Sequence, residues 1–97
     1  MKILIIRLSS IGDIVLTTPI IRCTRKAYPD AEIHFLTKKS FVSLVEHNPH
    51  LNTIKPYEKA LEKELVQQLQ SESYDLVIDL HKNVRTRRLI KTLNTKS

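Results

Sequence analysis

Short apolar runs alternate along this chain with segments whose apolar residues recur every three or four positions. The run from Lys2 to Arg7 is continuous and rich in β-branched residues, which is typical of a parallel strand buried on both faces. Further apolar runs at residues 32–37, 53–55 and 76–80 predict three more strands. Because helical segments separate these runs, we expect a three-layer α/β fold with a mostly parallel sheet and right-handed crossovers.

The first helical segment carries apolar residues at spacings of three and four, and we expect this face to pack on the sheet. Its members are Leu16, Ile20, Cys23 and Ala27. Pro19 interrupts the pattern, so it either kinks one helix or begins a second one, with Thr17 or Thr18 as the capping residue. Cys23 is the only cysteine, which excludes a disulfide framework, and it is interpreted as a small core residue.

Later segments predict three further helices. Ser40 is predicted to cap a short helix that ends before residues 48–50. Leucines at spacings of four mark a helix from residue 58 to about 71. A last, basic helix is predicted to begin at Asn83.

The loop after the first strand is the strongest functional signal in the chain. Ser9-Ser10-Ile11-Gly12-Asp13 lies just beyond that strand, and open α/β sheets bind ligands beyond the carboxyl ends of their parallel strands. Gly12 is the only glycine, so we expect this position to need either glycine's backbone freedom or its missing side chain. The hydroxyls of Ser9 and Ser10 are suited to orienting a polar substrate.

The carboxylate of this loop has two interpretations on local pattern alone. In the first, Ser10 or Asp13 caps the helix that follows. In the second, Asp13 is a general base that takes a proton from an attacking hydroxyl. The two roles can coincide in one residue.

A second candidate loop follows the fourth strand. It contains Lys82, Asn83 and Arg85, and further arginines follow at positions 87 and 88. The planar guanidinium of arginine donates two charge-assisted hydrogen bonds to a phosphate or carboxylate, so the loop predicts an anion-binding site. The alternative is a solvent-exposed basic helix face. Its place at the carboxyl end of a strand favours the functional interpretation.

The chain as a whole is basic, with sixteen lysines and arginines, ten acidic residues and a formal charge of +6. This charge favours anionic partners such as phosphorylated sugars, nucleic acid or a membrane surface. Nucleic acid is disfavoured, because the tyrosines and phenylalanines are scattered over expected core positions instead of alternating with the arginines. The histidines and the cysteine show no metal-ligand spacing, so we expect no metal site.

Length and missing motifs narrow the choice further. A chain of 97 residues is expected to form a single domain. It has neither an apolar run of the roughly 20 residues that span a bilayer nor a signal peptide, so we expect a cytoplasmic protein. One glycine cannot build a G-x-G-x-x-G turn or a phosphate-binding loop, and no G-x-S-x-G occurs. Classical NAD binding, Walker-type ATP hydrolysis and serine-hydrolase chemistry are therefore excluded.

The opening of the chain resembles a known family of enzymes. Residues 2–13, ending in Arg7-Leu8-Ser9-Ser10-Ile11-Gly12-Asp13 and continued by Thr17-Thr18-Pro19, closely resemble the start of glycosyltransferase family 9, the lipopolysaccharide heptosyltransferases. The segments 28–31, 48–51 and 74–83 also fit this family, so the resemblance covers the whole chain. The opening motif is its most specific part, because strand, serine pair, glycine, aspartate and proline recur together in order.

The resemblance implies a fold and an activity. Members of the family have two facing Rossmann-like lobes, the GT-B arrangement, and residues 1–97 would be the N-terminal, acceptor-binding lobe as a single Rossmann-like domain. The C-terminal lobe, which binds the donor, would be missing, and this polypeptide alone would be inactive. The complete enzyme would be an inverting transferase that moves heptose from ADP-heptose to the lipopolysaccharide inner core without a cofactor or an obligatory metal.

The resemblance also implies roles for individual residues. Asp13 matches the aspartate that is proposed as the general base of the family. Ser9, Ser10 and Gly12 would shape the loop on the acceptor side. Arg7 and the basic loop, with Lys82, Asn83 and Arg85, would face anionic groups of acceptor or donor.

One alternative function is a non-catalytic module that binds nucleotides or phosphorylated ligands at the same basic strand ends. A further hypothesis concerns the membrane, because the acceptor of the family is anchored in the inner leaflet and a +6 chain would be drawn to anionic headgroups. Contact would be peripheral and reversible, at the inner face of the inner membrane. Failure to co-sediment with anionic vesicles at low salt would contradict it.

Overall fold

Four parallel strands form one sheet in the computed structural model, which describes residues 1–8 and 11–81. The strands are β1 (Lys2–Ile6), β2 (Glu32–Lys38), β3 (Thr53–Tyr57) and β4 (Leu76–Asp79), arranged in the order β3-β2-β1-β4. All three pairings are parallel. The four predicted strands are therefore confirmed, whereas the basic helix predicted from residue 83 lies outside the described residues.

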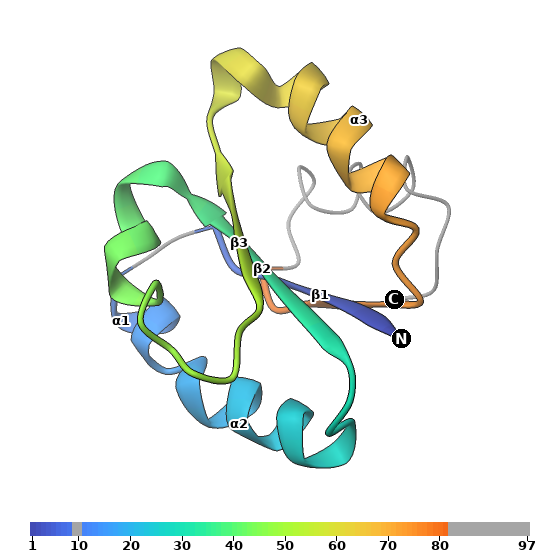
Figure 1. Ribbon diagram of the computed structural model, residues 1–97. Coiled ribbons are helices and arrows are strands. Elements are labelled where there is room, and N and C mark those ends of the chain that lie inside the picture. Colours follow the sequence, from blue (N-terminus) through green and yellow to red (C-terminus); the bar gives the residue numbers. More distant parts are fainter. Residues whose placement is uncertain (9–10, 82–97) are drawn as a thin grey trace.

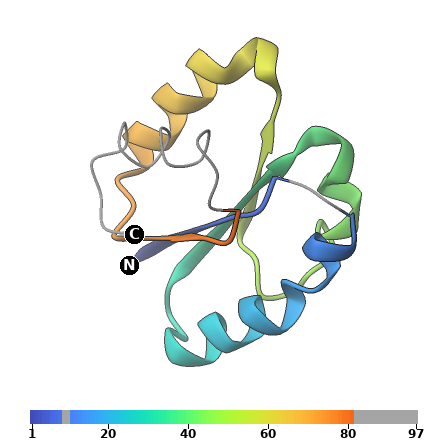
Figure 2. The same cartoon turned by 180° about the vertical axis from the view of Figure 1, so that it is seen from behind.

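Helical segments cover both faces of the sheet. One face carries α1 (Ile11–Val15), α2 (Thr18–Ala27) and the 3-10 helix η1 (Lys39–Leu44), and the other carries α3 (Glu62–Glu72), which follows the short 3-10 helix η2 (Lys59–Leu61). Figure 1 shows α2 and α3 on opposite sides of the sheet. The view from behind in Figure 2 shows the same separation. The expected three-layer α/β fold is confirmed.

The central strand β1 explains why the first apolar run does not alternate. Leu4 and Ile6 pack on the α3 side, whereas Ile3 and Ile5 pack on the α2 side, and all four side chains are fully buried. A strand covered on both faces needs apolar residues at every position. Each such burial contributes about 1.5–3 kcal/mol of hydrophobic free energy.

The structure corrects the predicted inner face of the first helical segment. Two helices replace the single pattern, because α1 ends at Val15 and α2 begins at Thr18 with Pro19 in its first turn. The break changes the rotational register, so Ile21 and Thr24 are the buried residues of α2. The predicted stripe was wrong: Leu16, Ile20, Cys23 and Ala27 are exposed.

The question of the proline is also settled. Pro19 begins a new helix instead of kinking one. Thr17 occupies the N-cap position but makes no side-chain cap, because its hydroxyl donates a hydrogen bond of 2.5 Å back to the carbonyl of Ile14. The prediction of Cys23 as a core residue was likewise wrong, since it is exposed. Tyr28, also expected in the core, is 40% exposed.

Other boundaries moved by a few residues. The third strand extends to Tyr57 and includes Pro56, which an edge strand tolerates because it needs no hydrogen bond on its open side. The α3 helix begins at Glu62 and not at residue 58, because η2 precedes it. No side chain caps η1, so Ser40 does not play its predicted role.

A network of charged residues joins two strands to α3. The carboxylate of Glu72 accepts hydrogen bonds from Lys55 Nζ at 2.8 Å and from Lys2 Nζ at 3.0 Å. These two bonds lower the pKa of Glu72 to about 2. Because Lys2 lies in β1, Lys55 in β3 and Glu72 at the end of α3, the network fixes the helix over the sheet.

A buried histidine lies beneath this network. His34 Nδ1 is 2.6 Å from the hydroxyl of Tyr74, and His34 Nε2 is 2.7 Å from a carboxylate oxygen of Glu32. Burial, with the nearby carboxylates of Glu72 and Glu32, raises the pKa of Tyr74 above its ordinary value. The tyrosine therefore keeps its proton and remains a hydrogen-bonding partner for the imidazole.

Candidate active site

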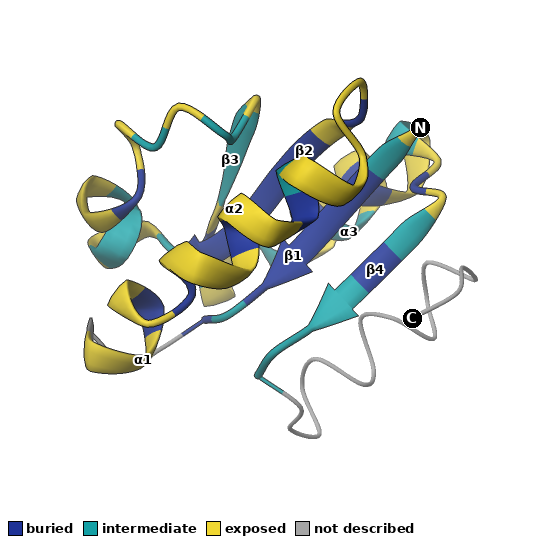
Figure 3. Ribbon diagram, turned by 90° about the horizontal axis from the view of Figure 1, so that it is seen from below, coloured by how far each residue is buried: buried dark blue, intermediate teal, exposed yellow. Residues whose placement is uncertain are grey.

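The strand order locates the ligand-binding edge of the sheet. The chain builds β1, β2 and β3 outward in one direction and then returns through α3 to place β4 on the other side of β1. Open α/β sheets bind ligands at such a reversal, beyond the carboxyl ends of the strands. In Figure 3 the arrows of β1 and β4 point toward the edge of the sheet at which α1 lies. The loop predicted to carry the chemistry is therefore at the reversal point.

Two residues predicted for the site lie against each other there. Arg7 follows β1, and Asp13 lies in the first turn of α1. Arg7 Nη2 donates a hydrogen bond of 2.6 Å to Asp13 Oδ2. The Asp13 side chain is 50% exposed and that of Arg7 is 21% exposed. The carboxylate is thus held by an ion pair and remains open to solvent.

The backbone around Arg7 is held on both sides. Its amide N–H donates a hydrogen bond to the carbonyl of Leu36 at 3.1 Å, and the amide of Leu80 donates to the carbonyl of Ile6 at 2.9 Å. The Arg7 side chain adds a bond of its own, from Nη1 to the carbonyl of Leu80 at 2.7 Å. The residue is therefore fixed between the ends of β2 and β4.

The capping interpretation of Asp13 does not fit its position. Asp13 is the third residue of α1 and lies inside the helix, whereas a capping residue precedes the first helical turn. An acidic residue in the first turn is favoured by the helix dipole. Ser10, the other predicted cap, lies outside the described residues.

Gly12 does not have the structural need that the sequence predicts. Its φ is not positive, and among residues 1–8 and 11–81 a Cβ added at this position would meet nothing within 4 Å. The described part of the chain therefore demands neither unusual backbone freedom nor the absence of a side chain. The open space lies next to Asp13, on the exposed surface of α1.

The other predicted site residues cannot be placed. Ser9, Ser10, Lys82, Asn83 and Arg85 lie outside the described residues. The start of the loop after β4 is described: the amide of His81 donates a hydrogen bond of 2.9 Å to Asp79 Oδ1, which shapes the turn. The predicted anion-binding role of this loop stays a prediction.

The pairing of Arg7 with Asp13 was missed by sequence reasoning, which assigned Arg7 to an anionic ligand. The sequence did contain a signal for this pairing, because Arg7 and Asp13 carry opposite charges and are only six positions apart. A second cluster that was missed consists of Glu32, His34 and Glu72, whose potential metal-ligand atoms all lie within 4.8 Å of one another. The carboxylate of Glu72 forms ion pairs with Lys2 and Lys55. This cluster is therefore part of the charged network described above.

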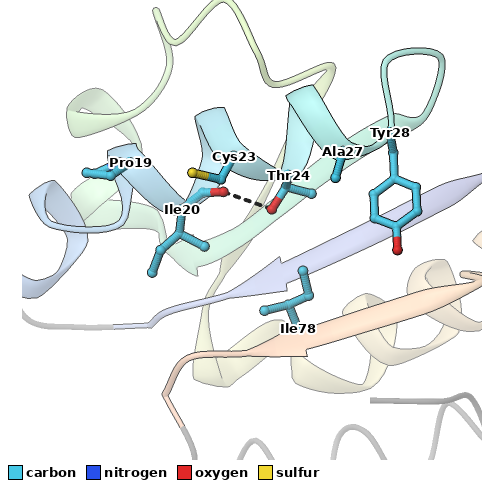
Figure 4. A pocket seen from close by; sticks show the side chains of 7 residues that line it. All are labelled: Pro19, Ile20, Cys23, Thr24, Ala27, Tyr28 and Ile78. Atoms are coloured by element: carbon cyan, nitrogen blue, oxygen red, sulfur yellow. Dashed lines mark hydrogen bonds between the residues drawn. The ribbon is translucent and has the colours of Figure 1, made fainter.

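An apolar groove lies on another part of the surface, between α2 and the edge strand β4 (Figure 4). Its volume is about 340 Å³. It is lined mainly by the face of α2 that was predicted to be buried, together with Ile78 of β4: Pro19, Ile20, Cys23, Thr24, Ala27, Tyr28 and Ile78. Neither Arg7 nor Asp13 lines this groove, so it is separate from the candidate active site. No helix among the described residues is long and apolar enough to cross a membrane.

Comparison with known proteins gives relatives of one kind. No family model matches the chain. Lipopolysaccharide heptosyltransferase 3 of Escherichia coli is 32% identical to it over 94 residues, with 88% of this chain and 28% of that protein covered.

Solved structures agree with this sequence relationship. The glycosyl transferase family 9 protein from Veillonella parvula is 26% identical, with a TM-score of 0.81, and the match covers 97% of this chain and 30% of that protein. The E. coli heptosyltransferase WaaC, solved with ADP-2-deoxy-2-fluoro heptose, has a TM-score of 0.85 at 24% identity, which shows a shared fold; the match covers 99% of this chain and 35% of WaaC. The chain thus spans between 28% and 35% of the length of these proteins.

Proposed function

The chain is a heptosyltransferase-like segment of glycosyltransferase family 9, and we propose that it forms the N-terminal, acceptor-side lobe of an enzyme that transfers heptose from ADP-heptose to the lipopolysaccharide inner core. The observation that carries this proposal is the half-exposed carboxylate of Asp13 at the reversal point of the sheet. A solvent-open carboxylate at this edge is placed to meet a substrate hydroxyl.

The reaction we propose is a single displacement with inversion. The acceptor hydroxyl attacks the anomeric carbon of the heptose while the bond from that carbon to the ADP oxygen breaks on the opposite face. Asp13 takes the hydroxyl proton, and ADP leaves with the bonding electrons. Basic groups at the strand ends stabilise the charge that develops on the phosphate. As written, this displacement uses no cofactor and no obligatory metal.

The remaining site assignments are part of the same proposal. Ser9, Ser10 and Gly12 shape the acceptor side of the loop, and Lys82, Asn83 and Arg85 face anionic groups of the substrates. A C-terminal lobe supplies the donor site, since the chain spans less than two fifths of the relatives it matches. The formal charge of +6 supports a cytoplasmic enzyme that touches the inner face of the inner membrane peripherally.

The test is Asp13→Asn in the complete enzyme, assayed with ADP-heptose and a lipopolysaccharide core acceptor. We expect kcat to fall by about 10²–10⁴, the typical contribution of a general base. Asp30→Asn is the matched control, because Asp30 is an exposed aspartate in the turn before β2. It should retain wild-type activity.

Two outcomes would contradict the proposal. If Asp13→Asn keeps transfer within about threefold of wild type, a loss far smaller than that of a missing base, Asp13 is not the base. If the complete wild-type protein binds nucleotide or phosphorylated ligands but transfers no sugar, the alternative of a non-catalytic binding module replaces the enzyme.

A further inference from the structure

The guanidinium of Arg7 makes two hydrogen bonds that lead to different elements. Nη2 donates to Asp13 Oδ2 in α1 at 2.6 Å, and Nη1 donates to the carbonyl of Leu80 beyond β4 at 2.7 Å. Because the guanidinium is planar and rigid, two such bonds fix both its position and its plane. The carboxylate of Asp13 is therefore aligned against a group that is itself anchored to the sheet.

Asp13 needs such an anchor more than a residue of the core would. It lies on a helix of only five residues, and half of its side chain is exposed. An exposed aspartate samples several rotamers, and each rotamer points the carboxylate in another direction. Arg7, by contrast, is held by its own backbone bond to Leu36.

The ion pair between Arg7 and Asp13 contributes too little to the free energy of folding to be explained by stabilisation of the fold. Pairs that are this exposed contribute about 0–1 kcal/mol to folding. Orientation is worth far more in catalysis, where a displacement of about 1 Å can cost roughly 100-fold in rate.

We propose that Arg7 is a positioning residue that aligns the carboxylate of Asp13; this rests on the proposed function, in which Asp13 is the base. The role differs from the one that sequence resemblance implies for Arg7, a direct contact with an anionic group of the substrate. A substrate contact changes mainly KM, whereas loss of alignment of the base changes mainly kcat.

The experiment compares Arg7→Met, Arg7→Lys, Asp13→Asn and the double variant Arg7→Met/Asp13→Asn in the complete enzyme. Methionine keeps an unbranched side chain but removes the charge and the donors, and lysine keeps the charge without the planar pair of donors. Arg25→Met is the matched control. Arg25 also donates to main-chain carbonyls, those of Ala31 and His50, but lies near the start of β2 and β3, away from Asp13.

We expect Arg7→Met to lower kcat about 10- to 100-fold with both KM values within about threefold of wild type. Arg7→Lys should recover part of the loss. The double variant should be no slower than Asp13→Asn alone, because the two residues act as one unit.

Three results would overturn the proposal. The first is an Arg7→Met enzyme with kcat within about threefold of wild type. The second is a raised KM with unchanged kcat, which would make Arg7 a substrate contact. The third is a double variant whose loss equals the product of the two single losses.

A second measurement separates this proposal from the proposed function. The ¹³C signal of the Asp13 carboxyl, compared by NMR at one pH in wild type and Arg7→Met, reports the pairing whether or not the protein transfers sugar. If its chemical shift changes in Arg7→Met while Asp13→Asn keeps full activity, the pairing holds and the assignment of Asp13 as base fails. An unchanged chemical shift shows that Arg7 does not act on Asp13.

Discussion

Gly12 is the only glycine of the chain, yet the described residues around it would accept a side chain. Its backbone is not left-handed, and its missing Cβ leaves open space on an exposed helix next to Asp13. Under the proposed function, we infer that the missing side chain leaves space for the acceptor beside the proposed base. On this hypothesis the acceptor requires glycine here, although the folding of the described residues does not.

Gly12→Ala tests this separation. We expect the free energy of unfolding to stay the same or rise by up to about 1 kcal/mol, because alanine is the better helix former. Transfer activity should fall about 5- to 150-fold, the cost of forcing a methyl group into a packed contact. Urea unfolding and a steady-state assay measure the two effects. Gln67→Ala, at an exposed position of α3, should change neither, and full activity in Gly12→Ala would refute the idea that acceptor space is needed here.

At the scale of the elements, the buried face of α2 is not the face that the spacing of apolar residues predicted. The longest apolar stripe of the segment is exposed, and its residues Ile20, Cys23 and Ala27 line the groove beside β4, whereas the buried residues of α2 are Ile21 and Thr24. A period read across residues 16–17 is misleading, because α1 has already ended there. Threonine on the buried side weakens the apolar signal further.

Two neighbouring isoleucines give a matched test of the observed face. Ile21 is fully buried, so Ile21→Ala should lower the free energy of unfolding by about 2–5 kcal/mol. Ile20 is 38% exposed, and Ile20→Ala should cost about 1 kcal/mol or less. Chemical denaturation of both variants measures the difference. Equal losses, or a larger loss at Ile20, would show that α2 packs through the face that the sequence predicted.

At the scale of the whole molecule, the two regions of the sheet have different tasks. The carboxyl ends of β1 and β4 hold the exposed pair of Arg7 and Asp13. The charged network around Glu72 joins β1, β3 and α3 elsewhere. Residues of the network are therefore expected to affect stability and residues of the exposed pair to affect activity.

Glu72→Gln tests the network through pH. The pKa of Glu72 is about 2 in the folded protein, below its ordinary value of 4.5, so the ionised carboxylate stabilises the fold above pH 4.5 and this contribution is lost as pH falls toward 2. We expect Glu72→Gln to be less stable than wild type at pH 7 and nearly equal to it near pH 2. Thermal unfolding across this range measures the difference, with Glu64→Gln on the exposed face of α3 as control. A gap that does not shrink in acid would assign the effect of Glu72 to packing.

Local patterns in the sequence were sufficient to predict most of the fold. The unbroken apolar run of β1, the leucines of α3 and the alternation of strands with helices predicted a three-layer parallel sheet, because burial on one or two faces leaves a period in the sequence. The position of Asp13 beyond the first strand was predictable for the same reason. Its catalytic role came from resemblance to a family and stays a proposal.

The sequence by itself determined which segments become strands and helices, and which loop follows the central strand. Only the tertiary structure decided which side chains meet: Arg7 with Asp13 and Leu80, Glu72 with two lysines, and Ile21 in place of Ile20 against the sheet. The physical reason is the distance along the sequence between the residues that interact. Periodicity records the contact of one element with an apolar environment, whereas hydrogen bonds and ion pairs between side chains and distant residues depend on strand order and loop path, which join residues as much as 73 positions apart.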